Sequence, residues 1–345
     1  MLAPLIVQVS AADPDANRYH EAYKRFIGSE SPAPPDKIKH FVFISRTEIR
    51  DHPFLENEQL AGAQILYPWK ALESSRGVYD FSMIRQDLDY LATKGKKLFV
   101  QLQDVTFDPK RRTVPAYLQT PEFNGGEFEK KNEAGTSLGW IAKRWNPAVR
   151  SRFIILIQTL GSEFDGKIEG INLPETAVEG VSDGSDPSFT PELYAEAIKT
   201  TMGALRKAFS KSVTMQYANF MPGEWLPWED KGYLRSIYAH GEEIGVGLGG
   251  PDLMVNRKAQ LNHALALMHE SRYSVPLGIA VQRGNYVGMT GADFAPGQDI
   301  PKLDQEETSD VAMLHAFARD FLRVRYIFWQ NEEPYFSRDV LSHLR

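Results

Sequence analysis

The stretch Lys167–Glu175, KIEGINLPE, decides how this chain is interpreted. Ile168–Leu173 is a short apolar run typical of a buried strand, and it leads through Pro174 directly to the carboxylate of Glu175. The Gly/Ser/Asp/Pro-rich stretch GVSDGSDPS follows at 180–188, and a segment of helical pattern comes after it. A carboxylate at the end of a buried strand is costly unless it has a function or a partner. In a barrel of alternating strands and helices, that end of the strand lies on the face that carries the chemistry.

Apolar runs of strand length recur along the chain and alternate with segments of helical periodicity. The predicted strands are Phe41–Ser45, Ala61–Tyr67, Lys97–Gln103, Ile168–Leu173, Val213–Ala218, Ile244–Leu248, Leu277–Gln282 and Tyr326–Gln330. Strands that alternate with helices in this number predict an α/β fold, a single (β/α)8 TIM barrel. The alternative is a doubly wound open sheet, which the lack of a Gly-rich phosphate loop after the first strand disfavours.

The predicted helices begin with recognisable signals. Pro147 follows a candidate Asn146 cap, and Thr190 opens the capping-box pattern TPEL. The first unit is the weakest, because Arg46–Leu60 has a poor helical pattern. The predicted helices are Ser82–Thr93, Pro147–Leu160, Thr190–Phe209, Asn256–Glu270 and Ser309–Arg323.

Two connections are too long to be simple turns. Asp104–Asn146 joins the third strand to its helix, and Gly284–Thr308 follows the seventh strand. Both lie after a strand and before a helix, so both fall on the active face of a barrel, with long loops after strands 3 and 7. Long loops at that face usually form the walls of a cleft.

The composition is that of an ordinary globular protein, with 345 residues, 42% hydrophobic and 24% charged. The net charge of −6 argues against nucleic acid as a partner. No run of about 18 apolar residues occurs, so no membrane partner is expected. The lack of cysteine excludes disulfides and thiolate chemistry.

No linker marks a second domain. We therefore predict one (β/α)8 catalytic domain over residues 1–345, in which residues 1–36 form an N-terminal extension packing on the barrel. The apolar start LAPLIVQVSAAD lacks the basic region of an export signal, and it fits a first strand or the remnant of a trimmed signal. A secreted or periplasmic location is expected, and a cytoplasmic location stays open.

The side chains at the predicted strand ends are mostly amides, aromatics and carboxylates. Amides and carboxylates hydrogen-bond hydroxyl groups in fixed directions, and aromatic rings stack on the apolar faces of pyranose rings. This set suits a carbohydrate, whereas a phosphate ligand would require Arg, Lys or a Gly-rich loop. None of the eight histidines are paired at HxxxH or HxH spacing, so no metal and no other cofactor is expected. The candidate substrate-binding residues are Arg46, Tyr67, Trp69, Gln103, Asn172, Gln216, Tyr217, Asn219, Tyr286 and Trp329.

Each candidate also has a structural explanation. Glu175 fits a carboxylate paired with an arginine such as Arg46, and Glu73 fits a residue that fixes its own loop. Asp252 follows Gly-Gly-Pro and fits an Asx turn, while Glu332 and Glu333 fit a solvated loop pair. The tryptophans near strand ends fit the core as well as a sugar contact; they are Trp69, Trp145, Trp225 and Trp329.

The stretch Gln64–Phe81, QILYPWKALESSRGVYDF, resembles the second-strand signature of clan A glycoside hydrolases. The resemblance is closest to the family 42 β-galactosidase-like group, with its pattern W-x-x-L-E-x-x-x-G-x-Y-D-F. It continues through RWNPAVRSRF at Arg144–Phe153 and the fourth strand at INLPET, and covers most of the barrel. It implies a (β/α)8 barrel, sugar substrates and an acid/base glutamate at the end of the fourth strand, where Glu175 stands.

The chain departs from that pattern at two places. The clan usually has Asn-Glu at the fourth strand, where this chain has Pro174–Glu175, and Asn172 is a possible substitute for the missing asparagine. The clan nucleophile is a glutamate at the end of the seventh strand, where this chain has Gln282. Three explanations stay open: a second carboxylate at Asp252, Glu332 or Glu333; a deliberate Glu-to-Gln change at 282; or a protein that binds sugar without cleaving it.

These observations predict a glycoside hydrolase that acts on a poly- or oligosaccharide. Glu175 is the predicted general acid, with a pKa raised by its apolar surroundings and a nearby carboxylate, and Asp252 is the first candidate for the relocated base. Carboxylates about 5–5.5 Å apart would indicate a retaining enzyme and about 6.5–9.5 Å an inverting one. The rival from another class is a non-catalytic carbohydrate-binding (β/α)8 barrel. A lyase or isomerase would need a metal or a Lys or His base at the strand ends, and none is evident.

Overall fold

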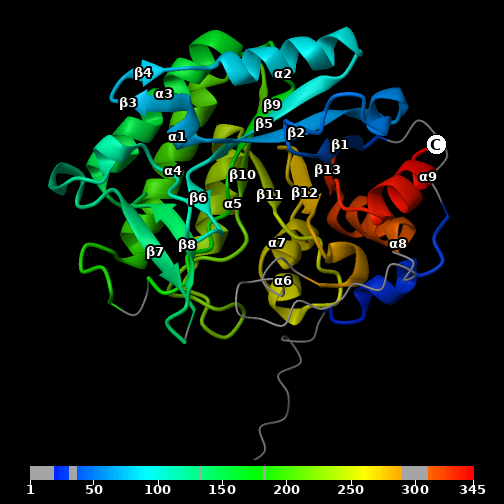
Figure 1. Cartoon of the computed structure of the whole chain (residues 1–345). Coiled ribbons are helices and arrows are strands. Elements are labelled where there is room, and N and C mark those ends of the chain that lie inside the picture. The colour runs from blue at the N-terminus through cyan, green and yellow to red at the C-terminus, as the bar shows by residue number, and fades with distance from the viewer. Residues whose placement is uncertain (1–18, 31–36, 133, 182–183, 290–309) are drawn as a thin grey trace, which may run out of the picture.

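The protein forms a closed barrel of parallel strands, seen here in a computed structural model (Figure 1). The structure describes residues 19–30, 37–132, 134–181, 184–289 and 310–345. The barrel order is β1-β13-β12-β11-β10-β9-β5-β2, in which each strand pairs in parallel with its neighbours, and this confirms the predicted (β/α)8 fold. The barrel strands are β1 (Lys39–Phe43), β2 (Leu60–Pro68), β5 (Lys97–Gln103), β9 (Gly170–Leu173), β10 (Val213–Tyr217), β11 (Gly247–Gly250), β12 (Leu277–Val281) and β13 (Tyr326–Gln330).

The sixth barrel strand lies further along the chain than its sequence suggests. The prediction of Ile244–Leu248 was wrong, because Ile244 ends helix α5 (Tyr233–Ile244) and Gly245 caps it at φ 76°. The strand β11 is instead GLGG, whose glycines conceal the usual pattern of apolar side chains. A Cβ on Gly249 would lie 2.7 Å from the carbonyl oxygen of Gly278 and 2.8 Å from the ring of Tyr217, so close packing of the barrel interior requires glycine here.

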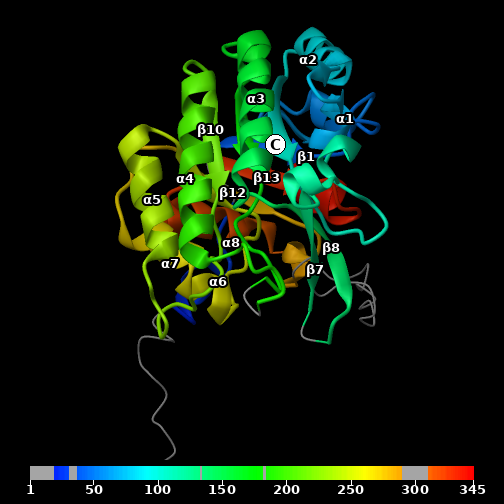
Figure 2. The same cartoon turned by 90° about the vertical axis from the view of Figure 1, so that its left-hand side faces the viewer.

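Helices cover the outside of the barrel, and Figure 2 shows α3, α4 and α5 side by side. The caps agree with the sequence: Asn146 accepts hydrogen bonds from the first turn of α3, and Thr190 accepts one from the amide of Leu193 in α4. The other α-helices are α1 (Trp69–Leu72), α2 (Ser82–Thr93), α3 (Pro147–Phe164), α4 (Pro191–Ala208), α6 (Lys258–Asn262), α7 (Ala264–Glu270), α8 (Val311–Ala316) and α9 (Leu341–His343). Short 3-10 turns lie at η2 (Ala22–Phe26), η3 (Pro53–Glu56), η4 (Ala116–Leu118), η5 (Pro121–Phe123) and η6 (Asn285–Val287). The π-helical segments are η8 (Phe317–Leu322) and η9 (Phe336–Val340).

Two helix predictions need correction. The predicted helix Asn256–Glu270 is two helices, α6 and α7, because the backbone leaves the helical region at His263. The segment Ser309–Arg323 is α8 followed by η8, and Ser309 lies outside the described residues. In the first unit, residues 44–59 form only the short turn η3, so the poor helical pattern of Arg46–Leu60 corresponds to a missing barrel helix.

The interior of the barrel is packed with aromatic side chains, so it leaves no channel through the middle. Phe41, Phe99, Phe328 and Tyr217 belong to one buried cluster with Met215, Ala280 and Tyr326. Near the amino-terminal ends of the strands, Glu169 is paired with Lys39 and Lys97. Because the interior is filled from below, a ligand can enter only at the carboxyl-terminal mouth.

The long connection after β5 forms its own three-stranded sheet. Its strands are β6 (Val105–Thr106), β7 (Glu127–Lys131) and β8 (Ser137–Ala142), in the order β6-β8-β7, and this sheet projects beside the barrel (Figure 1). A smaller hairpin joins β3 (Glu73–Ser75) to β4 (Val78–Tyr79) after β2. The predicted loop Gly284–Thr308 is described only up to Met289, and residues 290–309 lie outside the described part.

The N-terminal segment contacts the outer helices in the part that the structure describes. Tyr19 packs edge-on against Phe321 of η8, and Phe26 packs edge-on against Phe317. The rest of the predicted extension 1–36 lies largely outside the described residues. Within the described chain, no helix combines the length and apolar character that crossing a membrane requires.

Candidate active site

The backbone of Glu175 is held at the barrel mouth by a buried arginine. Glu175 follows β9, and its carbonyl oxygen accepts a hydrogen bond from Nη1 of Arg144 at 2.8 Å. Arg144 forms a two-pronged ion pair with Asp104, at 2.6 and 2.8 Å, and also donates to the hydroxyl of Tyr194. Asp104 comes directly after β5 and Tyr194 lies in α4, so two neighbouring barrel units fix the loop that carries Glu175.

The carboxylate of Glu175 is partly buried and points toward the next strand end. Its Oε2 accepts a hydrogen bond from Nδ2 of Asn219 at 2.5 Å, and Asn219 follows β10. Burial raises the pKa of Glu175 to about 7, with the nearby charges of Glu179 and Asp252 adding to the rise while Lys130 and the Asn219 amide oppose it. The alternative explanation, an ion pair of Glu175 with Arg46, does not hold, because Arg46 binds Asp87 through two nitrogens.

A buried lysine from the long connection lies close to this carboxylate. Lys130 of β7 is 1% exposed, and its Nζ lies 3.4 Å from the carboxylate of Glu179 and 3.7 Å from the ring centre of Phe107. A buried ammonium is stable only where a carboxylate or an aromatic face compensates it. Lys130 and Glu179 thus place one positive and one negative charge beside Glu175.

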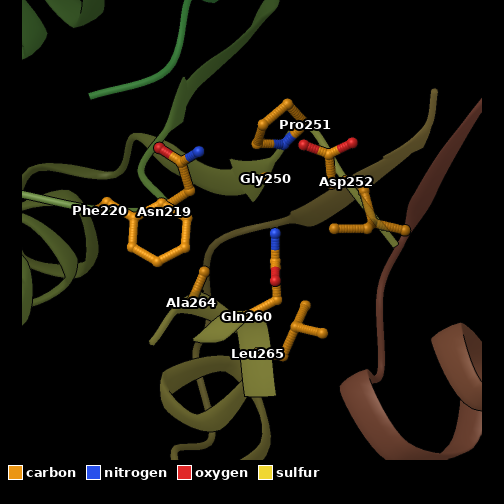
Figure 3. A pocket seen from close by; sticks show the side chains of 9 residues that line it. Asn219, Phe220, Gly250, Pro251, Asp252, Gln260, Ala264 and Leu265 are labelled. Carbon is orange, nitrogen blue, oxygen red and sulfur yellow. The ribbon is translucent and has the colours of Figure 1, made fainter. Parts of the chain in front are cut away.

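A small pocket lies between the ends of β10 and β11 (Figure 3). Asn219 and Phe220 line one side and Asp252 the other, while the side chain of Gln260 points into the space between them. The Oδ1 atom of Asn219 and the Oε1 atom of Gln260 are buried and accept no hydrogen bond from the described residues. Asp252 accepts a hydrogen bond from Nδ2 of Asn285 at 3.2 Å. The residues of the pocket thus include two buried amide oxygens without a donor in the described chain and the carboxylate of Asp252, and Asn219 connects the pocket to Glu175.

Gln282 stands at the end of β12, where the resemblance implied a carboxylate. Its backbone amide donates to Oδ1 of Asn285 at 2.7 Å, and its side chain is partly exposed. On the next strand, Glu332 accepts a hydrogen bond from the amide of Gly284 at 2.7 Å, and burial raises the pKa of this carboxyl group. Glu332 thus binds the backbone of the loop after β12, and this contact supports a structural role for it.

Several predicted residues lie inside the barrel below the mouth. Asn172 accepts a hydrogen bond from Nε2 of Gln64 at 3.0 Å, and the same nitrogen donates to the hydroxyl of Tyr217. These side chains form a buried polar layer above the aromatic interior. Gln103 is also buried, and its Oε1 accepts no hydrogen bond from the part of the chain that the structure describes. Of this group, Gln103 is the one whose side-chain oxygen is buried without a hydrogen-bond donor among the described residues.

Other predicted residues point away from the mouth, into the layer between barrel and helices. The hydroxyl of Tyr67 donates to Asp87 of α2, the partner of Arg46, at 2.8 Å. Gln216 donates to the carbonyl oxygen of Pro174, and Trp329 donates to His40. The structure does not bring these side chains to Glu175. Also buried are Trp69, which donates to Glu73, and Tyr286, which donates to the carbonyl oxygen of Gln330.

The motif that carried the resemblance builds a loop. Glu73 accepts hydrogen bonds from the indole of Trp69, the amide of Gly77 and the hydroxyl of Tyr117, and it forms an ion pair with Arg152 at 2.6 Å. Gly77 lies at φ 76°, where other residues are strained. The structural explanation for Glu73 is therefore the one that its contacts support.

Sequence reasoning missed Lys130, Glu179, Gln260 and Arg144. Lys130 belongs to the run EFEKK of β7, which carries no motif, and Gln260 lies in α6 outside any strand end. Only Arg144 gave a signal, because it opens the stretch RWNPAVRSRF. Among the described residues, no three His, Asp or Glu side chains come together as a metal site would require.

Solved structures match this fold at low sequence identity. The catalytic domain of beta-amylase from Paenibacillus polymyxa aligns with a TM-score of 0.53 at 11% identity, over 86% of this chain and 93% of that one. A GH5_18 variant from Streptomyces cattleya in complex with Manb1-4GlcNAc gives 0.54 at 14%, over 85% and 70%. Endo-glycoceramidase II from Rhodococcus sp. gives 0.52 at 11%, over 89% and 78%.

These structural neighbours are glycoside hydrolase barrels, and at such identities the likeness establishes the fold alone. No family model matches the chain, and no curated protein matches its sequence. The particular resemblance to family 42 is therefore not established. The assignment of a function rests on the side chains at the barrel mouth.

Proposed function

We propose that the protein is a glycoside hydrolase in which Glu175 is the general acid. The observation that carries this proposal is a partly buried carboxyl group at the barrel mouth whose pKa is raised to about 7. A carboxyl group with that pKa is substantially protonated near neutral pH and can give its proton to a departing glycosidic oxygen. The side-chain amide of Asn219 orients the Glu175 carboxyl group, and the hydrogen bond from Arg144 to the carbonyl oxygen of Glu175 fixes the backbone at this position.

Asp252 is the proposed base. It lies across the pocket from Asn219 and close enough for its charge to raise the pKa of Glu175. In the proposed reaction, Asp252 takes a proton from water as the water oxygen bonds to the anomeric carbon. The bond from that carbon to the glycosidic oxygen breaks, and Glu175 protonates the leaving oxygen. This sequence inverts the anomeric centre, as expected where water attacks directly.

A non-catalytic carbohydrate-binding barrel is the second candidate, and Gln282 favours it. An amide cannot form the glycosyl-enzyme ester that a retaining enzyme of clan A requires. The two candidates share the same mouth and differ only in whether a bound glycan is cut. The distinction therefore depends on product formation and not on binding.

The deciding experiment compares the wild type with Glu175→Gln on two kinds of substrate. One is a panel of gluco-, manno-, xylo- and galacto-oligosaccharides, and the other is the matching dinitrophenyl glycosides, whose leaving group needs no proton. The variant should lose about 10²- to 10⁴-fold in rate on the oligosaccharides and far less on the dinitrophenyl glycosides. Following the first product anomer by NMR then shows inversion or retention.

Glu179→Gln is the matched control, because Glu179 is also a carboxylate beside the site but is 43% exposed and paired with Lys130. It should keep most of the rate and shift the pH profile. Equal activity of wild type and Glu175→Gln on the oligosaccharides would exclude Glu175 as the acid. Tight binding without any product from the wild type would instead support the carbohydrate-binding barrel.

A further inference from the structure

An exposed tryptophan stands beside the pocket and has no role in the scheme above. Trp225 is 47% exposed, in the loop between β10 and α5. Its ring lies parallel to that of Phe220, with centroids 5.7 Å apart and planes within 10°. Phe220 in turn lines the pocket together with Asn219 and Asp252 (Figure 3). The two rings therefore form an offset aromatic step that leads from the pocket outward.

The backbone on both sides of Trp225 is fixed. Trp225 exchanges two backbone hydrogen bonds with Glu229, at 2.8 and 3.2 Å. The preceding Glu224 accepts hydrogen bonds from the amides of Tyr233 and Leu234 at the start of α5. A large aromatic side chain that is exposed and held in place can bind a ligand with little loss of conformational entropy.

A buried histidine supports the step from beneath. His263 is 1% exposed, and its ring centre lies 4.6 Å from that of Phe220 and 4.7 Å from that of Trp225. Its Nε2 accepts a hydrogen bond from the amide of Leu226, and its Nδ1 donates to the carbonyl oxygen of Ala259. Burial lowers the pKa of His263 to about 4, so the ring stays neutral and keeps its acceptor across the usual pH range. The step is therefore preorganised.

We propose that Trp225 and Phe220 form a subsite for a second sugar unit of the same oligosaccharide whose scissile bond lies at Glu175. This inference rests on the proposed function, since it names the substrate class of that site. Asn219 connects the two places, because it donates to Glu175 and stands next to Phe220 in the chain. A pyranose ring presents an apolar face of C–H groups that matches the exposed aromatic surface of Trp225. The preferred substrate is therefore an oligosaccharide and not a simple monosaccharide glycoside.

Trp228 provides a matched control in the same loop. It is 53% exposed, and the described residues place no aromatic ring against it. Both Trp225→Ala and Trp228→Ala remove an exposed tryptophan side chain from this loop. Only Trp225→Ala also removes a ring that stacks on Phe220. Trp225→Phe keeps an aromatic face at the first position, and melting temperatures of all variants report whether the loop stays folded.

The test measures both binding and cleavage. Affinity for gluco-, manno-, xylo- and galacto-oligosaccharides, from mono- to hexasaccharide, is measured by calorimetry on proteins that also carry Glu175→Gln, and cleavage is measured on the wild-type background. Trp225→Ala should weaken the affinity for the longer oligosaccharides by about tenfold or more. It should leave monosaccharide affinity and the kcat/KM of a dinitrophenyl monosaccharide unchanged. Trp228→Ala should change neither, and Trp225→Phe should restore most of the loss.

The outcomes separate this inference from the proposed function. If Trp225→Ala and Trp228→Ala cleave oligosaccharides at the same rate, the subsite is overturned and the proposed hydrolase is left intact. An equal loss on long and short ligands would also overturn it, because the effect would then not depend on a second sugar unit. Long ligands that bind through Trp225 without being cleaved would support the subsite and overturn the hydrolase. Failure of every saccharide to bind would overturn both.

Discussion

The carboxyl group of Glu175 should make the stability of the protein depend on pH in a way that Glu175→Gln removes. Its pKa is raised in the folded state, chiefly by burial, so the folded protein binds the proton more tightly than the unfolded chain. Stability therefore falls as pH rises through the interval between the two pKa values. The variant has no titrating group at this position, and its amide can still accept the hydrogen bond from Asn219.

The size of the effect follows from the two pKa values. The pKa of Glu175 rises from the usual 4.5 to about 7, and at about 1.4 kcal/mol per pH unit this corresponds to about 3 kcal/mol. Most of it, about 2–3 kcal/mol, falls between about pH 5 and pH 8.5, and the rest falls just below pH 5, where the unfolded chain titrates. Both states are protonated below about pH 3.5 and ionised above about pH 8.5. Over this range Glu175→Gln should gain that much in unfolding free energy relative to the wild type.

The assay is denaturant unfolding of both proteins at several pH values, with a direct titration of the Glu175 carboxyl carbon by NMR. Glu58→Gln serves as control, since Glu58 is exposed and its replacement should leave the pH dependence of the wild type unchanged. Parallel stability profiles for wild type and Glu175→Gln would mean that Glu175 titrates as it does in the unfolded chain. The proposed acid would then have no proton to give near neutral pH.

The remaining predictions concern the frame around the site. Asp104→Asn leaves the buried guanidinium of Arg144 without its carboxylate, so it should cost about 3–5 kcal/mol in denaturant unfolding, and a smaller loss would show that the pair is solvated. The same change should lower the affinity for oligosaccharides, because Arg144 holds the backbone of Glu175. Gly62→Ala would place a Cβ 1.9 Å from the carbonyl oxygen of Lys97, so it should cost about 1–3 kcal/mol by thermal unfolding; a wild-type melting temperature would contradict the β2–β5 packing.

The position of Glu175 was predictable because it follows from the order of elements. An apolar strand that ends in a carboxylate points to one face of a (β/α)8 barrel whatever the exact strand boundaries are. The direction of the neighbouring side chains was not predictable in the same way. Barrel strands are buried on both sides, so apolar and polar residues do not alternate and the register stays hidden. Tyr67 and Trp329 lie at strand ends and therefore fit the pattern of substrate-binding residues, although their side chains face the helices.

The charges that tune Glu175 come from segments distant in sequence. Lys130 reaches the site from the sheet inserted after β5, and Asp252 from the loop after β11. The approach of Lys130 depends on how that sheet packs beside the barrel, and the approach of Asp252 depends on the course of its loop, and no local sequence pattern encodes either of them. The burial of Glu175, the largest cause of its raised pKa, likewise depends on all the loops that surround it. Sequence thus identifies Glu175 as the candidate acid, and only the assembled mouth explains its raised pKa.

Gln282 bears on the covalent route but not on the proton donor. In a retaining pair, the ionised nucleophile helps to keep its partner protonated, because two adjacent carboxylates resist joint ionisation. Here the leading cause is burial, and the negative charges of Glu179 and Asp252 add to it, so the pKa of Glu175 stays raised with a neutral amide at 282. The machinery for protonating a leaving group therefore does not depend on the missing carboxylate. What the amide removes is the ester intermediate, and the proposed reaction therefore proceeds by direct attack of water, with Asp252 as the proposed base.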